Sequence, residues 1–286
     1  MKTPKFQHFF EINIAILLIS TSGALGRFID MPPPVIIWMR SVLAVIFLGA
    51  FCWYKKINFK IKDKKNSKTI FLSGVFMGIH WVTYFYALHL SNVAIGMLSL
   101  FTYPVVTTFL EPLFLKTKIN LRHVILGVLV LIGIQFLVPD FDLENDQTLG
   151  IVFGLVSAVF YAMRNILMKK MVHGHHGSLL MFYQMLIISV FLWPVIFYFD
   201  FSISTSDIGA LITLALVTTT IGHTLFVMSF KNFSIGTASI MSSIQPIYGI
   251  IFAFFFLSEI PNLNTIIGGS IIVLTVVIEA IYHNKR

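Results

Sequence analysis

The sequence predicts an all-α integral membrane protein with ten transmembrane helices, arranged as two inverted repeats of five helices each. The first observation is composition: 57% of the 286 residues are hydrophobic and only 11% are charged, whereas soluble domains carry about 25% charged residues. The second is a mean hydropathy of +0.88, which indicates more apolar surface than one soluble core of this size could bury. The third is a partial match between the two halves of the sequence.

Ten apolar stretches each approach the roughly 20 residues that a helix needs to cross a bilayer. The connections between them are short, so no inserted soluble domain is expected. The expected spans are residues 11–29, 35–54, 69–88, 92–115, 122–139, 149–168, 178–199, 207–229, 235–257 and 263–282. Two lysines precede the first stretch, as they would in a cleaved signal sequence. The acid Glu11 and the evenly spaced spans that follow favour a retained helix.

Lysine and arginine gather in alternate connections, which predicts the orientation of the chain in the membrane. Placing both termini in the cytoplasm puts 17 of the 20 bases inside, seven of them in residues 55–68. The outer connections instead carry most of the acids. The basic pI of about 9.5 therefore reflects membrane topology, and no nucleic-acid partner is expected. The predicted location is the inner (plasma) membrane, as a multi-pass protein.

The two halves of the sequence match when they are shifted by 142 residues. Pro104 then falls on Pro246, and residues 118–129 fall on residues 260–271 without a gap. The predicted repeats are residues 1–143 and 144–286. Because five spans is an odd number, the second repeat must enter the membrane from the opposite side, as in inverted-repeat transporters.

Pro104 and Pro246 interrupt otherwise apolar spans at matching positions. Proline cannot donate a backbone hydrogen bond and therefore kinks a helix. Irregular backbone at membrane depth needs protein or a water-filled cavity to cover it. The paired prolines predict two kinked helices that line a cavity, although transmembrane proline is also common without such a role.

Several motifs now resemble one known family. They are "PPPVIIWMR", which ends at Arg40, "YALHLSNVAIGMLSLFTYPVVTTFLEPLF", "GIVFGLVSAVFYAMRNILMKK" and "FKNFSIGTASIMSSIQPIYGIIFAFFFLSE". With ten short-looped spans, they resemble the drug/metabolite transporter superfamily, specifically its EamA-like ten-helix transporters. Glu259 takes the position of an acid typical of that family after the ninth span, whereas Thr117 stands at the corresponding place after the fourth.

The resemblance implies a secondary transporter that exports small organic solutes, such as amino acids or related metabolites, by alternating access. A uniporter or exchanger for another metabolite, nucleotide or drug-like solute is the alternative. An intramembrane enzyme or a channel is less favoured, because the sequence lacks HExxH, GxSxG and TVGYG motifs. No cofactor is expected. The expected partners are a small-molecule substrate, protons as a candidate coupling ion, and the lipid bilayer, with the chain acting as a monomer or homodimer.

Polar side chains inside the spans are candidates for the substrate path, because they are costly in the membrane. His80, Thr83 and Tyr84 share one helical face, and a histidine can exchange protons near neutral pH or remain neutral and hydrogen-bonded. Gln184 is a weaker candidate. The predicted cavity residues are His80, Thr83, Tyr84, Ser99, Thr102, Tyr103, Tyr161, Asn165, His223, Ser242, Gln245 and Tyr248.

Three charged residues inside the spans are candidates for charge pairing or gating. Arg40, Glu111 and Arg164 could face the cavity, or they could extend their charged ends toward a membrane surface. An ion pair between Arg164 and Glu111 is one hypothesis. The histidine cluster at residues 173–177 has no carboxylate beside it, and no metal site is expected.

Overall fold

The computed structural model describes residues 6–61, 63–115, 121–137, 142–233 and 235–283, and every regular element in these residues is a helix. The first half contains α1 (Phe6–Phe28), α2 (Pro33–Tyr54), α3 (Lys64–Leu90), α4 (Val93–Leu100), α5 (Tyr103–Leu115) and α6 (Leu121–Leu137). The second half contains α7 (Asp146–Met171), α8 (Gly177–Leu192), α9 (Val195–Tyr198), α10 (Thr205–Thr213), η1 (Leu214–His223), α11 (Thr224–Ser229), α12 (Ile235–Ser242), α13 (Gln245–Leu257) and α14 (Leu263–His283).

Six helical stretches in the described part of the chain are long and apolar enough to cross a membrane. They are Phe6–Phe28, Pro33–Tyr54, Lys64–Leu90, Asp146–Met171, Gly177–Tyr198 and Thr205–Ser229. Shorter apolar stretches are Val93–Thr107, Ile125–Leu137, Gln245–Leu257 and Leu263–Thr275. Each predicted span overlaps one of these stretches. The number of membrane crossings and the inverted repeat remain predictions.

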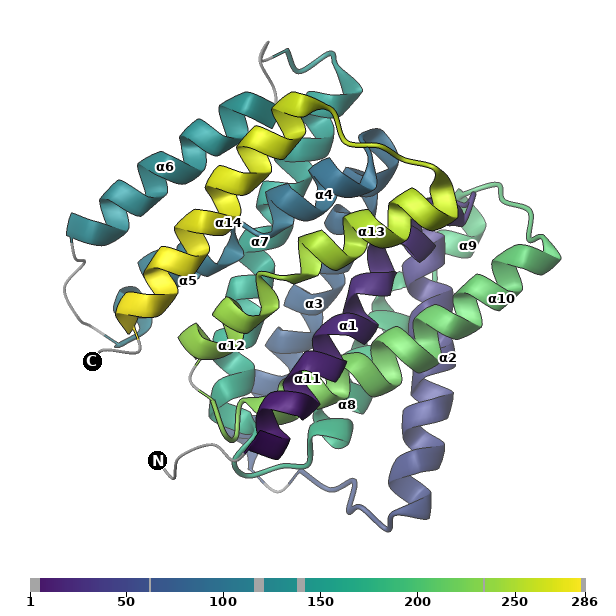
Figure 1. Ribbon diagram of the computed structural model, residues 1–286. Coiled ribbons are helices and arrows are strands. Elements are labelled where there is room, and N and C mark those ends of the chain that lie inside the picture. The colour runs from purple at the N-terminus through teal and green to yellow at the C-terminus, as the bar shows by residue number, and fades with distance from the viewer. Residues whose placement is uncertain (1–5, 62, 116–120, 138–141, 234, 284–286) are drawn as a thin grey trace.

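The helices form a bundle in which long partners run side by side (Figure 1). Helix α3 packs along α7, α2 packs along α8, and α1 crosses the bundle between η1 and α13. Helices α6 and α14 lie together at one side. Glycines permit their close approach, because a Cβ atom added to Gly268 would lie 2.5 Å from the backbone oxygen of Gly133. The bundle thus places α1, α3, α4, α7, η1 and α13 around a common centre.

The spans that contain Pro104 and Pro246 are each broken just before that proline. Helix α4 ends at Leu100 and α5 begins at Tyr103, while α12 ends at Ser242 and α13 begins at Gln245. Without an N–H group, Pro104 and Pro246 cannot donate to the carbonyls four residues earlier. Both prolines are buried. The irregular backbone therefore lies inside the protein, where neighbouring helices cover it.

The span that contains His223 is continuous but changes its winding. Residues Leu214–His223 form a π-helix between α10 and α11. The Thr219 and Thr220 hydroxyls each donate to the carbonyl five residues earlier, over 2.8 Å. Nothing in the sequence pattern indicated this wider turn, and π-helical turns are frequent at functional sites.

Candidate functional site

A small buried chamber lies where helices of both halves meet. Helices α1, α3, α4, α7, η1 and α13 contribute to its wall. The lining residues are Ile19, Ser22, His80, Trp81, Tyr84, Met97, Leu100, Phe101, Tyr161, His223 and Gln245. The chamber has a volume of about 20 Å³, which is enough for roughly one water molecule. Five predicted cavity residues therefore meet at one place: His80, Tyr84, Tyr161, His223 and Gln245.

His80 is held in one orientation by α7. Its Nδ1 lies 2.7 Å from the Ser157 hydroxyl oxygen, and that hydroxyl donates to the His80 carbonyl over 2.9 Å. A hydroxyl carries a single hydrogen, so Nδ1 must be the donor in the first contact. In a neutral ring with its hydrogen on Nδ1, the acceptor nitrogen is Nε2. The ring also stacks on Tyr161, with centroids 4.4 Å apart.

An aromatic contact joins this wall to the two broken helices. Tyr103 packs edge-on against Tyr161, with ring centroids 4.8 Å apart. The Tyr103 hydroxyl lies 2.5 Å from the Ser242 hydroxyl, which itself donates to the Ser239 carbonyl over 2.8 Å. Because that hydrogen is already used, Tyr103 is the donor to Ser242. One hydrogen bond thus connects the start of α5 with the end of α12, across the two halves.

Arg40 is completely buried beside the chamber, which excludes the expectation that it reaches a membrane surface. Its guanidinium carbon lies 3.8 Å from the centroid of the Trp81 ring. Its Nε donates to Thr219 over 2.7 Å and its Nη1 to Ser22 over 3.3 Å. Its Nη2 is buried without a hydrogen-bond partner among the described residues. Ser22, which the sequence analysis missed, is signalled only by the small polar run "STSG" inside an apolar span.

Arg164 is also completely buried, so the expectation that it extends to the surface is wrong. Its Nε and Nη2 donate to the side-chain oxygen of Gln184 over 3.1 and 2.9 Å, and its Nη1 donates to Asn165 over 3.0 Å. Gln184 therefore has a larger role than the sequence suggested. The Glu111 side chain, the other member of the hypothetical ion pair, lies outside the part of the structure that is described.

Several predicted cavity residues lie away from the chamber. Thr83 donates to its own helix, at the carbonyls of Ile79 and His80, and lines a different groove against α8. The reason is geometric: of the predicted α3 face, His80 and Tyr84 line the chamber, whereas Thr83 lies toward α8. Ser99 and Thr102 likewise bond to carbonyls of their own segment. Tyr248 is half-buried outside the chamber lining.

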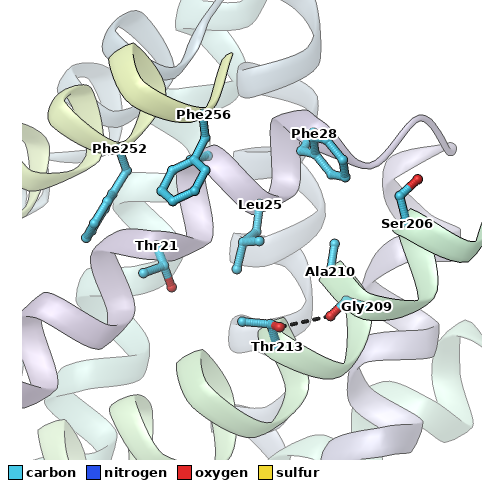
Figure 2. A pocket seen from close by; sticks show the side chains of 10 residues that line it. Thr21, Leu25, Phe28, Ser206, Gly209, Ala210, Thr213, Phe252 and Phe256 are labelled. Atoms are coloured by element: carbon cyan, nitrogen blue, oxygen red, sulfur yellow. Dashed lines mark hydrogen bonds between the residues drawn. The ribbon is translucent and has the colours of Figure 1, made fainter. Parts of the chain in front are cut away.

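The largest groove among the cavities described is lateral and apolar (Figure 2). It has a volume of about 420 Å³ and lies between α1, α10 and α13. Leu25, Phe28, Phe252 and Phe256 supply much of its wall. The hydroxyl of Thr213 is engaged by the carbonyl of Gly209 at 2.8 Å. The groove is therefore suited to contact with hydrocarbon chains. The polar candidates for substrate binding instead lie in the smaller chamber.

Contacts close the bundle at the end where α1 finishes. Arg27 lies 3.5 Å from Glu259 and donates to the His89 carbonyl over 3.0 Å. Glu259 also accepts from the Val93 N–H over 2.9 Å. These bonds tie together the ends of α1, α3, α4 and α13. Glu259, the family-like acid noted in the sequence, is thus a cross-link at the rim and lies outside the chamber wall.

A corresponding tie lies near the opposite end of the bundle. The Lys169 ammonium donates to the carbonyls of Phe230 and Phe233 over 2.5 and 2.7 Å. These contacts fasten the last turn of α7 to the connection between α11 and α12. With ties near both ends and a volume for about one water, the chamber is too small to hold an organic solute in this structure.

Known proteins are similar to this chain in sequence. An uncharacterized transporter of Archaeoglobus fulgidus is 27% identical over 85% of this chain and 89% of its own length. A pseudopaline exporter of Pseudomonas aeruginosa is 22% identical over 93% and 90%. An S-adenosylmethionine uptake transporter of Rickettsia felis is 23% identical over 75% and 72%.

One solved crystal structure shares the fold, with a TM-score of 0.71 over 99% of both chains at 14% identity. The sequence model of the EamA-like transporter family matches two stretches of the chain, residues 11–138 and 148–279. These stretches cover most of the molecule, including the residues of the chamber. The chain therefore belongs to the EamA-like transporter family.

Proposed function

We propose that this protein is a secondary transporter of the inner membrane that moves small organic solutes by alternating access. Amino acids and related metabolites are the proposed substrate class, and export is the proposed direction. Both termini would face the cytoplasm, as the lysine distribution predicts. The proposed energy source is a solute or proton gradient, since the sequence carries no GxxxxGK[ST] nucleotide-binding loop.

The observation that carries this proposal is the small buried chamber beside the two broken helices. Its wall combines residues of both halves, and the hydrogen bond between Tyr103 and Ser242 crosses between them. Broken helices whose irregular backbone meets a central site are a common basis of alternating access. The two family matches, at residues 11–138 and 148–279, support a two-unit architecture.

Direction is the part of the proposal that the relatives leave open. One relative is named as an exporter and another as an uptake transporter. Alternating access is reversible in principle, and the gradient decides net direction. Export is favoured here through the resemblance to the EamA-like exporters.

His80 is the proposed proton-handling group of the chamber. Its Nδ1–H is engaged by Ser157, which leaves Nε2 as the atom that can accept a proton. Both His80 and His223 line the chamber. Either ring would therefore be in reach of a solute that entered the chamber.

Counterflow in proteoliposomes tests the proposed function. Vesicles loaded with an unlabelled amino-acid mixture would receive trace labelled mixture outside, with and without an imposed pH gradient. A carrier shows saturable label uptake that rises with the internal load. Uptake that neither saturates nor depends on the load would contradict a carrier.

A matched pair of variants on α3 ties the flux to the chamber. His80→Ala removes a chamber group, whereas Thr83→Ala removes a hydroxyl that bonds only within its own helix. We expect at least a tenfold loss of counterflow for the first and little change for the second. Equal effects of the two changes would refute the assignment of the chamber as the transport site.

A further inference from the structure

We propose that Arg40 anchors an anionic oxygen group of the substrate, a carboxylate or a phosphate, at the chamber. This inference rests on the proposed transport function and names the chemistry of its substrate. It makes Arg40 a substrate-binding residue, beyond the pairing or gating role that its position in α2 suggested.

The first argument is charge balance. Arg40 and Arg164 are both completely buried. Neither lies within ion-pair distance of a carboxylate among the described side chains. An arginine remains protonated in proteins, and a buried charge is costly unless a counter-charge or hydrogen bonds compensate it. Among the described side chains, the centre of the bundle therefore holds two positive charges with no carboxylate paired to them.

The second argument separates the two arginines. All three nitrogens of Arg164 donate to neutral groups, which uses four of its five N–H groups. Arg40 keeps Nη2 buried and unpartnered, and its Nη1 contact with Ser22 is long at 3.3 Å. Nη2 and the second N–H of Nη1 therefore lie side by side on one fork, which is the geometry that binds a carboxylate or phosphate through two parallel hydrogen bonds.

The third argument is a second unpartnered group in the chamber wall. His223 lines the chamber, and its Nδ1 is buried without a hydrogen-bond partner among the described residues. In the tautomer that carries its hydrogen on Nδ1, this ring donates to an oxygen acceptor. A carboxylate or phosphate held by Arg40 would then satisfy both groups.

The surroundings of Arg40 fit a binding site that opens. Two of its contacts, Ser22 and Trp81, line the chamber wall. The Trp81 ring packs over the guanidinium and holds it beside the chamber. The present volume of about 20 Å³ is too small for a carboxylate-bearing solute. Binding therefore requires the chamber to expand, as a closed state of an alternating-access cycle would.

Thermal stability of the purified full-length protein in detergent tests the inference without using transport. The probes are inorganic phosphate and acid–amide pairs, such as succinate with succinamide and alanine with alaninamide, at equal ionic strength in chloride. A ligand that binds the folded state raises the melting temperature with its concentration. We expect at least one acid or phosphate to stabilise the protein while the matched amide or chloride does not.

Variants then locate the anion. Arg40→Met should raise the half-saturating concentration of the stabilising anion at least tenfold. Arg40→Lys should retain part of the stabilisation by the anion because it keeps the charge. Lys68→Gln removes an exposed charge from α3 and should change nothing. If Arg40→Met does not fold, Arg40→Lys alone tests the site. It should raise the half-saturating anion concentration more than threefold without abolishing the stabilisation.

Three results would overturn the inference: no anion stabilises the parent above chloride, the amides stabilise it equally, or the anion effect survives unchanged in the Arg40 variants. If Lys68→Gln raises the half-saturating anion concentration as much as the Arg40 variants do, the stabilisation comes from an adventitious ion only. Anion binding without counterflow would refute the proposed transport function and leave the site standing. Counterflow of neutral or cationic solutes without anion binding would refute the anion site and leave the proposed transport function standing.

Discussion

Replacing Gln184 with leucine should expose how the buried Arg164 is stabilised. The Gln184 side-chain oxygen accepts two hydrogen bonds from Arg164, over 3.1 and 2.9 Å. Its nitrogen donates to the Ser73 hydroxyl over 3.1 Å. Leucine has a comparable size but no polar atom. The variant therefore leaves a buried guanidinium without its main acceptor, while the packing volume is kept.

The magnitude follows from the number and type of bonds removed. Hydrogen bonds to charged groups contribute about 1.5–3 kcal/mol each, and removing one partner of a buried charge costs about 3–5 kcal/mol. We expect Gln184→Leu to lower the free energy of unfolding by about 3 kcal/mol. At roughly 2–4 °C per kcal/mol for chains of about 150–250 residues, the melting temperature should fall by about 6–12 °C.

A double-variant cycle isolates the cause of this loss. The assay is the melting temperature in detergent for the parent, Gln184→Leu, Arg164→Met and the combination of both changes. Removing donor and acceptor together leaves few unpaired polar atoms and can be nearly neutral. The combined variant should therefore be more stable than Gln184→Leu alone. Asn264→Leu, at an exposed asparagine of α14, serves as the surface control.

One result would refute this reasoning. If the two single effects simply add in the combined variant, the coupling energy is zero and Gln184 does not act through Arg164. The loss would then arise from packing or from the contact with Ser73.

Three further changes test other parts of the structure. Gly268→Ala would place a Cβ 2.5 Å from a backbone oxygen of α6. It should therefore lower the free energy of unfolding by about 1–3 kcal/mol. As its control, a Cβ added at Gly209 meets nothing within 4 Å, so Gly209→Ala should be neutral or stabilising in the same melting assay. Burial and a neighbouring lysine lower the pKa of His176, which lies between the spans. Because the unfolded chain then binds the proton more readily, stability should fall as the pH drops below the ordinary histidine value of about 6.5, and His176→Asn should remove that part of the pH dependence. Glu259→Gln breaks the half-exposed pair with Arg27, so melting curves should show a loss below about 1 kcal/mol that disappears in about 1 M salt.

The broad architecture was predictable because lipid imposes a simple rule on the sequence. Long apolar runs separated by short polar connections indicate spanning helices, and the described helices overlap the expected spans. The helix breaks at Pro104 and Pro246 follow equally directly from the missing N–H group. These features depend on local chemistry, and a single sequence contains all of it.

The arrangement of the chamber was less accessible from sequence. His80 and Thr83 share a helical face by spacing, yet only His80 reaches the chamber. Which edge of a face meets the centre depends on how neighbouring helices rotate, and no periodicity encodes that rotation. The partnership of Arg164 with Gln184 likewise joins residues on two helices whose contact the sequence does not specify.

The π-helix at Leu214–His223 should let this span tolerate the deletion of a single residue. Its i→i+5 bonds accommodate an additional residue within the helix. Deleting Val217 would let the segment rewind as an α-helix while the flanking helices keep their mutual register. In an unbroken α-helix such as α3, the same deletion would turn everything beyond it by about 100° and shorten it by about 1.5 Å. Single-residue gaps between related chains are therefore expected here, at the turn that presents Thr219 to Arg40.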